Sequence, residues 1–352
     1  MIKQETVYEM RLVSALEKVF LDERPVYRPE CMKLTALKGE TVSFQAACTC
    51  TSFMKNRVKV RIESPISDRI HVRKVENVPA GRVCGPIVDD NYLKTESGLY
   101  PDLLRELVDG EVDIFPQKWR SIWIDIEVTE DVKAGLYPVT VILEKDGETL
   151  ARAAAEVTIY DAVLPRQKIM HTEWFYLDCL ADYYHVPVFS EEHWEIITNY
   201  LKEYVKRGCN MILTPLFTPA LDTAVGIERT TTQLLDVWVE NGNYSFGFDR
   251  VKKWIDLCQS CGIEYFEICH LFSQWGAKYA PKVMAVVNGK EEQIFGWHTP
   301  AVGEYTKFLH SLLPQLTEKL REWGIDKVTY FHLSDEPREE HLESYRAAKE
   351  SI

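Results

Sequence analysis

Two adjacent carboxylates, Asp335 and Glu336, end an apolar run in the segment KVTYFHLSDEP (residues 327–337). The run is rich in β-branched and aromatic residues and has helix-forming sequence on both sides, which is typical of a parallel strand between crossover helices. In such sheets ligands bind at the carboxyl ends of the strands, where this pair falls. Pro337 favours an extended backbone at Glu336. Adjacent strand residues point to opposite faces, so the chain must bend there if both carboxylates are to face one pocket.

A pair of this kind has a clear chemical use. Two neighbouring carboxylates cannot both ionise cheaply in a cleft, so one is expected to keep its proton near neutral pH. A proton donor beside an anion is the equipment of glycoside hydrolysis. The structural alternative is that Asp335 caps the helix that follows, with Glu336 in its first turn. Acidic pairs before helices are common, so spacing alone leaves both interpretations open.

Composition narrows the function classes. The 352 residues are 46% hydrophobic and 27% charged, a globular balance with material for about two domains. The net charge of -13 argues against nucleic-acid partners and anionic membrane surfaces. No apolar run approaches the roughly 20 residues that span a bilayer, and the N-terminus lacks a secretory signal, so we expect a cytoplasmic protein. The nine cysteines form no framework. We predict no structural metal and no cofactor, and the composition leaves the oligomeric state open.

Residues 1–163 predict an all-β sandwich domain. Short alternating or apolar segments, punctuated by glycine and proline, are typical of such a fold. Strands are expected at residues 41–50, 57–64, 120–128, 137–145 and 151–161. The segment LLRELV (103–108) is expected to form a short helix.

Residues 166–352 predict an α/β domain of the (β/α)8 barrel type, because apolar strands there alternate with amphipathic helices. Strands are expected at 169–176, 210–217, 263–272 and 326–333, and helices at 191–207, 249–261, 301–323 and 338–350. Residues 230–248 predict a hairpin that turns at Asn241-Gly242. A doubly wound sheet is the alternative, although no glycine-rich phosphate turn follows the first strand. A closed barrel needs about 250 residues, so only about the first four βα units are present. We expect either a truncated chain or half-barrels that assemble.

Aromatic and hydrogen-bonding side chains follow the expected strands. Such side chains suit a sugar, which has apolar CH faces and a rim of hydroxyl groups. The candidate substrate-binding residues are Glu173, Trp174, His270, Gln274, Trp275 and Trp297. Each alone is more commonly a core residue, and their convergence on one rim is what favours a site. Glu267, inside the third strand, is expected to pair with a neighbouring base.

Several longer motifs resemble the catalytic domain of glycoside hydrolase family 123. They are HTEWFYLDCLADYYHVPVFSEEHW (171–194), GCNMILTPLFTPALDT (208–223), EICHLFSQWGAKYAPKV (267–283), FGWHTP (295–300) and FHLSDEP (331–337). The N-terminal half is similar to the sandwich domain that precedes the catalytic domain in this family. The resemblance therefore covers nearly the whole chain.

The resemblance implies a β-N-acetylgalactosaminidase-like enzyme that uses substrate-assisted retaining catalysis. Its partner would be a carbohydrate with a terminal β-linked 2-acetamido sugar, N-acetylgalactosamine rather than N-acetylglucosamine. Asp335 matches the family acid that holds the acetamido N–H, and Glu336 matches the general acid. One alternative is a two-carboxylate retaining glycosidase that has Glu336 as its acid and a nucleophile in the missing strands. The other is an inactive, truncated carbohydrate-binding fragment.

Overall fold

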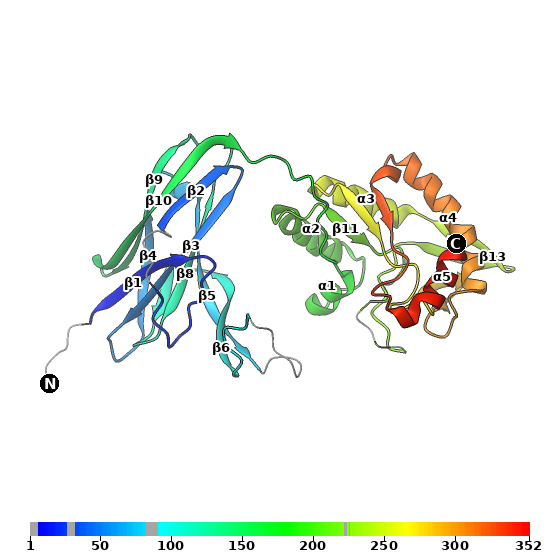
Figure 1. Cartoon of the computed structure of the whole chain (residues 1–352), viewed down its shortest axis with the longest axis horizontal. Coiled ribbons are helices and arrows are strands. Elements are labelled where there is room, and N and C mark those ends of the chain that lie inside the picture. Colours follow the sequence, from blue (N-terminus) through cyan, green and yellow to red (C-terminus); the bar gives the residue numbers. More distant parts are fainter. Residues whose placement is uncertain (1–5, 27–31, 82–90, 222–223, 225) are drawn as a thin grey trace. The chain divides into compact units, whose positions relative to one another are not determined.

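The computed structural model describes residues 6–26, 32–81, 91–221, 224 and 226–352. The chain divides into two compact units, Met1–Arg166 and Gln167–Ile352. Figure 1 shows that the first unit is built almost wholly of strands and that the second mixes helices with strands. None of the helices in the described residues is both long and apolar enough to cross a membrane.

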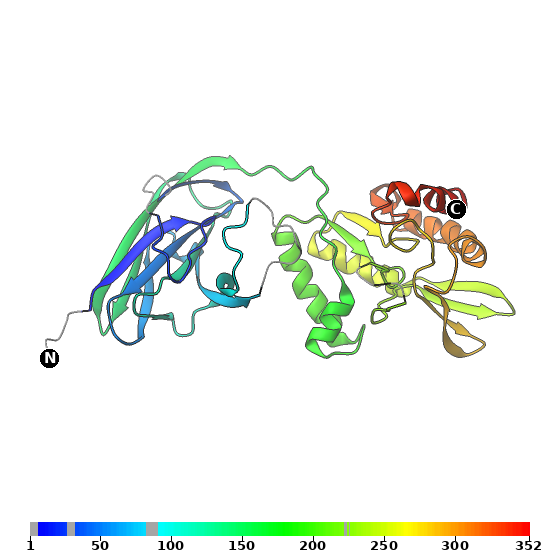
Figure 2. The same cartoon turned by 60° about the horizontal axis from the view of Figure 1, so that its bottom comes forward.

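The first unit contains two five-stranded sheets, whose strands can be followed in Figure 2. The first sheet has the order β1 (Tyr8–Ser14), β3 (Thr41–Cys50), β8 (Arg120–Glu127), β5 (Ile70–Ala80), β6 (Gly98–Glu106). The second has the order β2 (Lys33–Lys38), β10 (Glu148–Val163), β9 (Gly135–Lys145), β4 (Asn56–Glu63), β7 (Glu111–Ile114). The all-β character predicted for this half is confirmed, and each of the five expected strands is present.

One hydrophobic cluster joins the two sheets. Alternate residues of β8, Ile122, Ile124 and Ile126, are fully buried, as are Val139 and Val141 of β9. Inward-facing residues at a period of two are what sheet-on-sheet packing requires. This packing is that of a β-sandwich.

The helix expected at residues 103–108 is wrong. Leu103–Glu106 are the last residues of β6, which pairs antiparallel with β5 so that Leu104 lies opposite Val75, and Val108 forms an isolated bridge to Glu111. Leu103 remains 43% exposed, so the segment has no apolar stripe for a helix to bury. Helix propensities differ by less than about 1 kcal/mol per residue, and the backbone hydrogen bonds of the ladder outweigh them.

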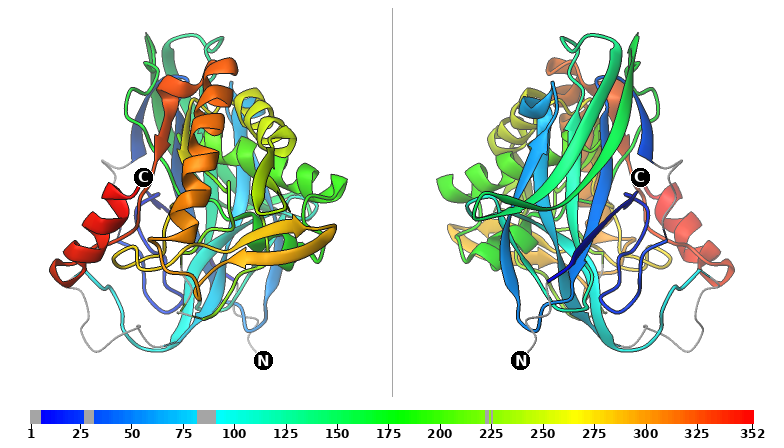
Figure 3. Two further views of the ribbon diagram at one scale, coloured as in Figure 1. Left: turned by 90° about the vertical axis from the view of Figure 1, so that its right-hand side faces the viewer. Right: turned by 90° about the vertical axis from the view of Figure 1, so that its left-hand side faces the viewer.

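The second unit is built around a parallel sheet of the order β11 (Met211–Thr214), β14 (Tyr265–Ile268), β17 (Thr329–Phe331). The helices are α1 (Leu177–Tyr184), α2 (Glu191–Lys206), α3 (Asp249–Cys261), α4 (Glu304–Glu322) and α5 (Leu342–Glu350). Figure 3 shows α4, in orange, beside the segment that leads into β17. The helices predicted at 191–207, 249–261, 301–323 and 338–350 are therefore confirmed, with small differences at their ends.

Helix α3 shows why these helices form where they do. Its buried residues, Val251, Trp254, Ile255 and Cys258, follow the spacing i, i+3, i+4, i+7, which places them on one face. The helix ends at Gly262, whose φ of 106° is a left-handed conformation that glycine adopts without strain.

The prediction of a strand at residues 169–176 is wrong. Only an isolated parallel bridge from Thr172 to Met211 remains. Next to it, the backbone N–H of His171 donates to the side chain of Asn210, whose own backbone N–H donates to the His171 carbonyl. These local bonds take the place of a regular ladder.

A second sheet has the order β13 (Asn243–Gly247), β12 (Asp236–Glu240), β15 (Val283–Val287), β16 (Lys290–Phe295). The predicted hairpin at 230–248 is confirmed as β12–β13, and Asn241 and Gly242 have φ of 51° and 76° at its turn. Positive φ at both central residues is the type I′ turn that asparagine and glycine favour.

Candidate active site

The carboxylate pair lies in the loop that leaves β17, at the carboxyl end of the strand. Asp335 is half-buried and Glu336 is exposed. Glu336 has φ of 43°, so the extended backbone expected before Pro337 is wrong. A left-handed residue reverses the local direction of the chain, which is the bend that an adjacent pair needs if both side chains are to serve one site.

The structure also rejects the capping interpretation. A short 3-10 turn, Glu339–His341, begins after Arg338, and α5 has His341 at its N-cap position. Asp335 is therefore too far before either element to cap it. The contacts of the pair with the loop after β14 account for its position instead.

Backbone hydrogen bonds attach this loop to the loop that follows β14. They run from Leu271 N to His332 O (3.0 Å), from Phe272 N to Leu333 O (3.0 Å) and from Trp275 N to Asp335 O (3.0 Å). The Ser334 hydroxyl adds a bond to the Ser273 carbonyl (2.7 Å). These bonds join the two loops beyond the ends of β14 and β17, and the main chain of Asp335 is fixed.

Each carboxylate is also held by a side chain from the second loop. Gln274 Nε2 donates to Asp335 Oδ2 (3.3 Å), and Trp275 Nε1 donates to Glu336 Oε2 (3.4 Å). Next to them, a Cβ at Gly276 would lie 2.7 Å from the Cβ of His341, so only glycine fits there. Two consecutive residues of one loop therefore position two consecutive residues of the other.

The electrostatics of the pair is uneven. Partial burial raises the pKa of Asp335 above its ordinary value, and the charge of Glu336 raises it further. The Gln274 hydrogen bond and the charge of His332 act in the opposite direction without cancelling the rise. Asp335 thus holds its proton more strongly than a free aspartate does.

Glu267 lies below the pair, on β14, with only 2% of its surface exposed. It accepts hydrogen bonds from His332 Nε2 (2.8 Å), Trp174 Nε1 (3.3 Å) and Thr172 Oγ1 (3.3 Å). Burial opposes its ionisation, but these three donors together lower the pKa of Glu267 below its ordinary value. The expectation that Glu267 pairs with a neighbouring base is confirmed, and the base is His332.

His270 is buried beside this pair. Its ring meets Trp174 edge-on with centroids 5.3 Å apart, and the ring of His332 is 4.4 Å away. Burial, with the charge of His332, lowers the pKa of His270 to about 4, so the ring is neutral near pH 7. Neither ring nitrogen finds a hydrogen-bond partner among the described residues. The Gln274 Oε1 atom is likewise buried without one.

The candidate substrate-binding residues thus divide into two groups. Trp174, His270, Gln274 and Trp275 contact the carboxylate pair or its supporting residues, as described above. Glu173 instead contacts His171 Nε2 (3.1 Å) and is largely exposed. Trp297 donates to the Ile227 carbonyl (3.0 Å) and packs against Tyr279.

His332 is the residue of this cluster that the sequence analysis missed. It lies in the quoted motif FHLSDEP, three residues before Asp335. The sequence did contain a signal for it. His332 follows Tyr330 by two residues, and residues two apart in a strand point to the same face of the sheet.

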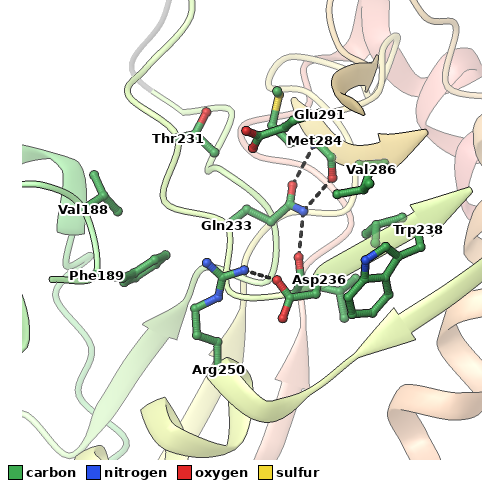
Figure 4. Close-up of a pocket in the computed structure, with 13 residues that line it drawn as sticks. Val188, Phe189, Thr231, Gln233, Asp236, Trp238, Arg250, Met284, Val286 and Glu291 are labelled. Atoms are coloured by element: carbon green, nitrogen blue, oxygen red, sulfur yellow. Dashed lines mark hydrogen bonds and ion pairs between the residues drawn. The ribbon is translucent and has the colours of Figure 1, made fainter. Parts of the chain in front are cut away.

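A separate cavity of about 320 Å³ lies between β12, β15 and the start of α3 (Figure 4). The close-up shows Arg250 paired with Asp236, and the Gln233 amide bonded to the backbone of Met284. These polar groups satisfy one another. None of the candidate site residues lines this cavity, so the chemistry is assigned to the loops after β14 and β17. No group of three or more potential metal ligands occurs within the described part of the chain.

Comparisons with known proteins bear on this assignment. The model of the glycoside hydrolase 123 catalytic domain matches residues 174–352, and that of the glycoside hydrolase 123 N-terminal domain matches residues 20–145. A solved family 123 glycoside hydrolase from Clostridium perfringens, described as hydrolysing glycolipid glycans, is similar with a TM-score of 0.69 and 17% identity. The match covers 98% of this chain and 62% of that one, so the chain spans less than two thirds of the solved structure.

Other solved structures resemble only part of the chain. The N-terminal domain of PorA has 11% identity and a TM-score of 0.22, over 44% of this chain and 99% of that domain. A β-glucosidase from Listeria innocua has 10% identity and a TM-score of 0.22, over 45% and 17%. Neither likeness carries an argument, and no curated protein matches the chain. The two family models together span nearly the whole sequence, and the chain belongs to glycoside hydrolase family 123.

Proposed function

We propose that the loops after β14 and β17 form the acid–base centre of a glycoside hydrolase. Its substrate is a terminal β-linked N-acetylhexosamine, and N-acetylgalactosamine is the sugar that we favour. The observation that carries the proposal is the pair of contacts from Gln274 to Asp335 and from Trp275 to Glu336. They hold two adjacent carboxylates in one place with different partners. Different surroundings are what allow two carboxylates to take different roles in one reaction.

The surroundings of the pair support a sugar as the substrate. Trp275 is 41% exposed and donates to Glu336, and Trp174 is 37% exposed and donates to Glu267, so both tryptophans are partly open to solvent. Next to Trp275 lie the half-buried carboxyl group of Asp335 and the exposed carboxyl group of Glu336, which can form hydrogen bonds with hydroxyl groups. Rings and polar groups together match the CH faces and hydroxyl groups of a pyranose.

In the proposed mechanism the substrate supplies the nucleophile. The 2-acetamido oxygen attacks C1 as the glycosidic bond breaks, while Glu336 donates a proton to the leaving oxygen. Asp335 in its ionised form accepts a hydrogen bond from the acetamido N–H and offsets the positive charge that develops on the oxazolinium ring. Because the pKa of Asp335 is raised, its ionisation sets the lower pH limit of this role. Glu336, now a carboxylate, then takes a proton from the water that attacks C1. The ring opens and returns the acetamido group with retention.

We also propose that the parallel sheet is the first part of a (β/α)8 barrel and that the sandwich ends near residue 163. Each strand of the order β11-β14-β17 lies beside the one before it in sequence, which is the winding of a barrel. Among the described residues β17 has a partner on one side only.

The mechanism is tested with aryl glycosides of N-acetylgalactosamine whose leaving phenols differ in acidity. Glu336→Gln should lose about 10²–10⁴-fold in rate on poor leaving groups and recover most of it on a highly acidic phenol. Asp335→Asn should recover far less, because its defect lies in the nucleophile. Glu339→Gln, an exposed carboxylate three residues away in the 3-10 turn, is the matched control and should keep full activity.

An N-acetyl thiazoline mimic of the intermediate should inhibit the wild type, because compounds that resemble the transition state bind more tightly than substrates. Equal rescue of both variants, or no inhibition by the thiazoline, would favour a two-carboxylate retaining glycosidase. Sugar binding without turnover would favour the carbohydrate-binding fragment.

A further inference from the structure

The proposed mechanism leaves the buried pair Glu267–His332 without a role. We propose that this pair is a positioning unit, in which the buried carboxylate of Glu267 anchors the His332 imidazolium and so holds a positive charge on the loop that carries Asp335, where it favours the ionised form of that carboxyl group. The inference rests on the proposed function, because it assigns Asp335 the task of accepting a hydrogen bond. A protonated carboxyl group would be a poorer acceptor and would carry no charge against the oxazolinium cation.

The carboxylate of Glu267 lies in a preformed set of hydrogen-bond donors. Its carboxylate is almost fully removed from solvent, yet three donors from two other segments converge on it: Thr172, Trp174 and His332. An ionised carboxylate only accepts hydrogen bonds, which matches three donors and no competing acceptor. A buried charge with this many donors is costly to neutralise or to move.

His332 is the one titratable donor among the three. Its hydrogen bond to Glu267 raises its pKa above the ordinary imidazole value; partial burial opposes the shift, and the charges of Glu267 and Asp335 add to it. The backbone of His332 is fixed by the bond from Leu271 N (3.0 Å) to its carbonyl. The imidazolium therefore has a set position three residues before Asp335, on the same loop.

Among Glu267, His270, Gln274, Asp335 and Glu336, His332 is the group that brings positive charge, while Arg338 and His341 follow the pair along the chain. From β14 and its loop come Glu267, the neutral His270 and the uncharged amide of Gln274. From the loop after β17 come Asp335 itself and Glu336. Burial and Glu336 both push Asp335 toward its protonated form, whereas His332 opposes them. The charge of His332 is thus the counterweight that the role of Asp335 requires.

The coupling is tested first without substrate, by NMR titration of the full chain. The imidazole ¹⁵N signals report the protonation of His332, and the carboxyl ¹³C signal reports that of Asp335. In His332→Gln the Asp335 titration should move to higher pH. In Glu267→Gln the His332 titration should move to lower pH, and that of Asp335 should follow to higher pH. His310→Gln, at a histidine of α4 that contacts the Ser351 carbonyl (2.8 Å), should move neither.

The kinetic readout separates positioning from a structural role. In His332→Gln the acid limb of kcat/KM should move to higher pH, so that the loss at pH 5 exceeds the loss at pH 7 by about threefold or more. KM should change less than kcat, because the side-chain partner of His332 is Glu267 and its effect on the reaction acts through the charge of Asp335. A uniform loss at every pH would mean that His332 serves only the fold, and would overturn the inference.

The two proposals fail separately. If His332→Gln folds and the Asp335 titration is unchanged, the positioning role is wrong even if hydrolysis proceeds as proposed. If the titrations are coupled but the chain cleaves sugars that lack a 2-acetamido group equally well, the proposed mechanism is wrong and the charge pair stands. Glu267→Gln is the variant with the greater risk to folding, and His332→Gln alone decides the outcome because its side chain is 41% exposed.

Discussion

Glycine in place of Glu336 should make the second unit more stable than alanine in the same place. Both substitutions remove the carboxylate, its contact with Trp275 Nε1 and its repulsion of Asp335, so these effects cancel in the comparison. What differs is the backbone. Glu336 has φ of 43°, where an L side chain crowds the following carbonyl and glycine does not.

The size of the difference follows from two opposing terms. The left-handed conformation costs an L residue roughly 1–2 kcal/mol, which alanine retains and glycine loses. Glycine gains more freedom in the unfolded chain, which costs about 0.4–1 kcal/mol of stability. The net expectation is that Glu336→Gly is more stable than Glu336→Ala by about 0.5–1 kcal/mol, or roughly 1–4 °C in Tm for a unit of this size.

The matched control is Glu195, an exposed residue inside α2 (Glu191–Lys206). There the order should reverse, with Glu195→Gly less stable than Glu195→Ala by about 1 kcal/mol, because glycine is a poor helix former. Urea unfolding followed by tryptophan fluorescence measures all four variants. The reasoning is refuted if alanine is the better residue at both positions. Then Glu336 would not be strained, and the bend would have another cause.

Three further outcomes follow from the contacts. Glu267→Gln should lower the free energy of unfolding by about 1–3 kcal/mol. The loss should be largest between about pH 4.5 and 6.5. The pKa of Glu267 is lowered, so the stability that its ionised form contributes is lost as pH falls; the pKa of His332 is raised, so the stability that its protonated form contributes is lost as pH rises. A loss that is independent of pH in thermal scans would contradict this. Thr214→Val removes the acceptor of the buried Trp254 Nε1 (3.2 Å) and should cost about 1–3 kcal/mol in urea unfolding, whereas Thr214→Ser keeps the hydroxyl and should cost less. Ile124→Val in the sandwich core should cost about 0.5–1.5 kcal/mol, with no change in the NMR signals of the Asp335 loop.

Much of the fold could be predicted because its signals are local. The periodicity of α3 and the Asn241-Gly242 turn each lie within a few residues and agree with the final structure. The same signal was present at Asn288-Gly289, where φ of 48° and 86° closes the hairpin β15–β16, and it was not used. Local chemistry was sufficient there too.

The errors have a different origin. Residues 103–108 favour a helix by propensity but pair with β5, and residues 169–176 are apolar enough for a strand but keep only one bridge. In both cases a partner distant in sequence decides the outcome, and no pattern within the segment reveals it. The same limit applies to the site. The sequence placed Asp335 and Glu336 at a strand end, but the contacts from Gln274 and Trp275 exist only because β14 lies beside β17.

The strain at Glu336 shows how a local conformation depends on a partner that is distant in sequence. A straight strand would place the side chains of Asp335 and Glu336 on opposite faces and separate the two carboxylates. The left-handed conformation of Glu336 removes that separation, but it lowers the folding free energy gained by the loop. The local sequence does not offset this cost, because Pro337 disfavours helical conformations at the residue before it. Hydrogen bonds from the neighbouring loop to His332, Leu333 and Asp335 offset this cost. Strain held in place by such a frame is typical of residues whose geometry serves a reaction. If the frame is what holds the bend, weakening it by Gln274→Ala should broaden the NMR signals of Asp335 and Glu336 and leave those of β17 sharp.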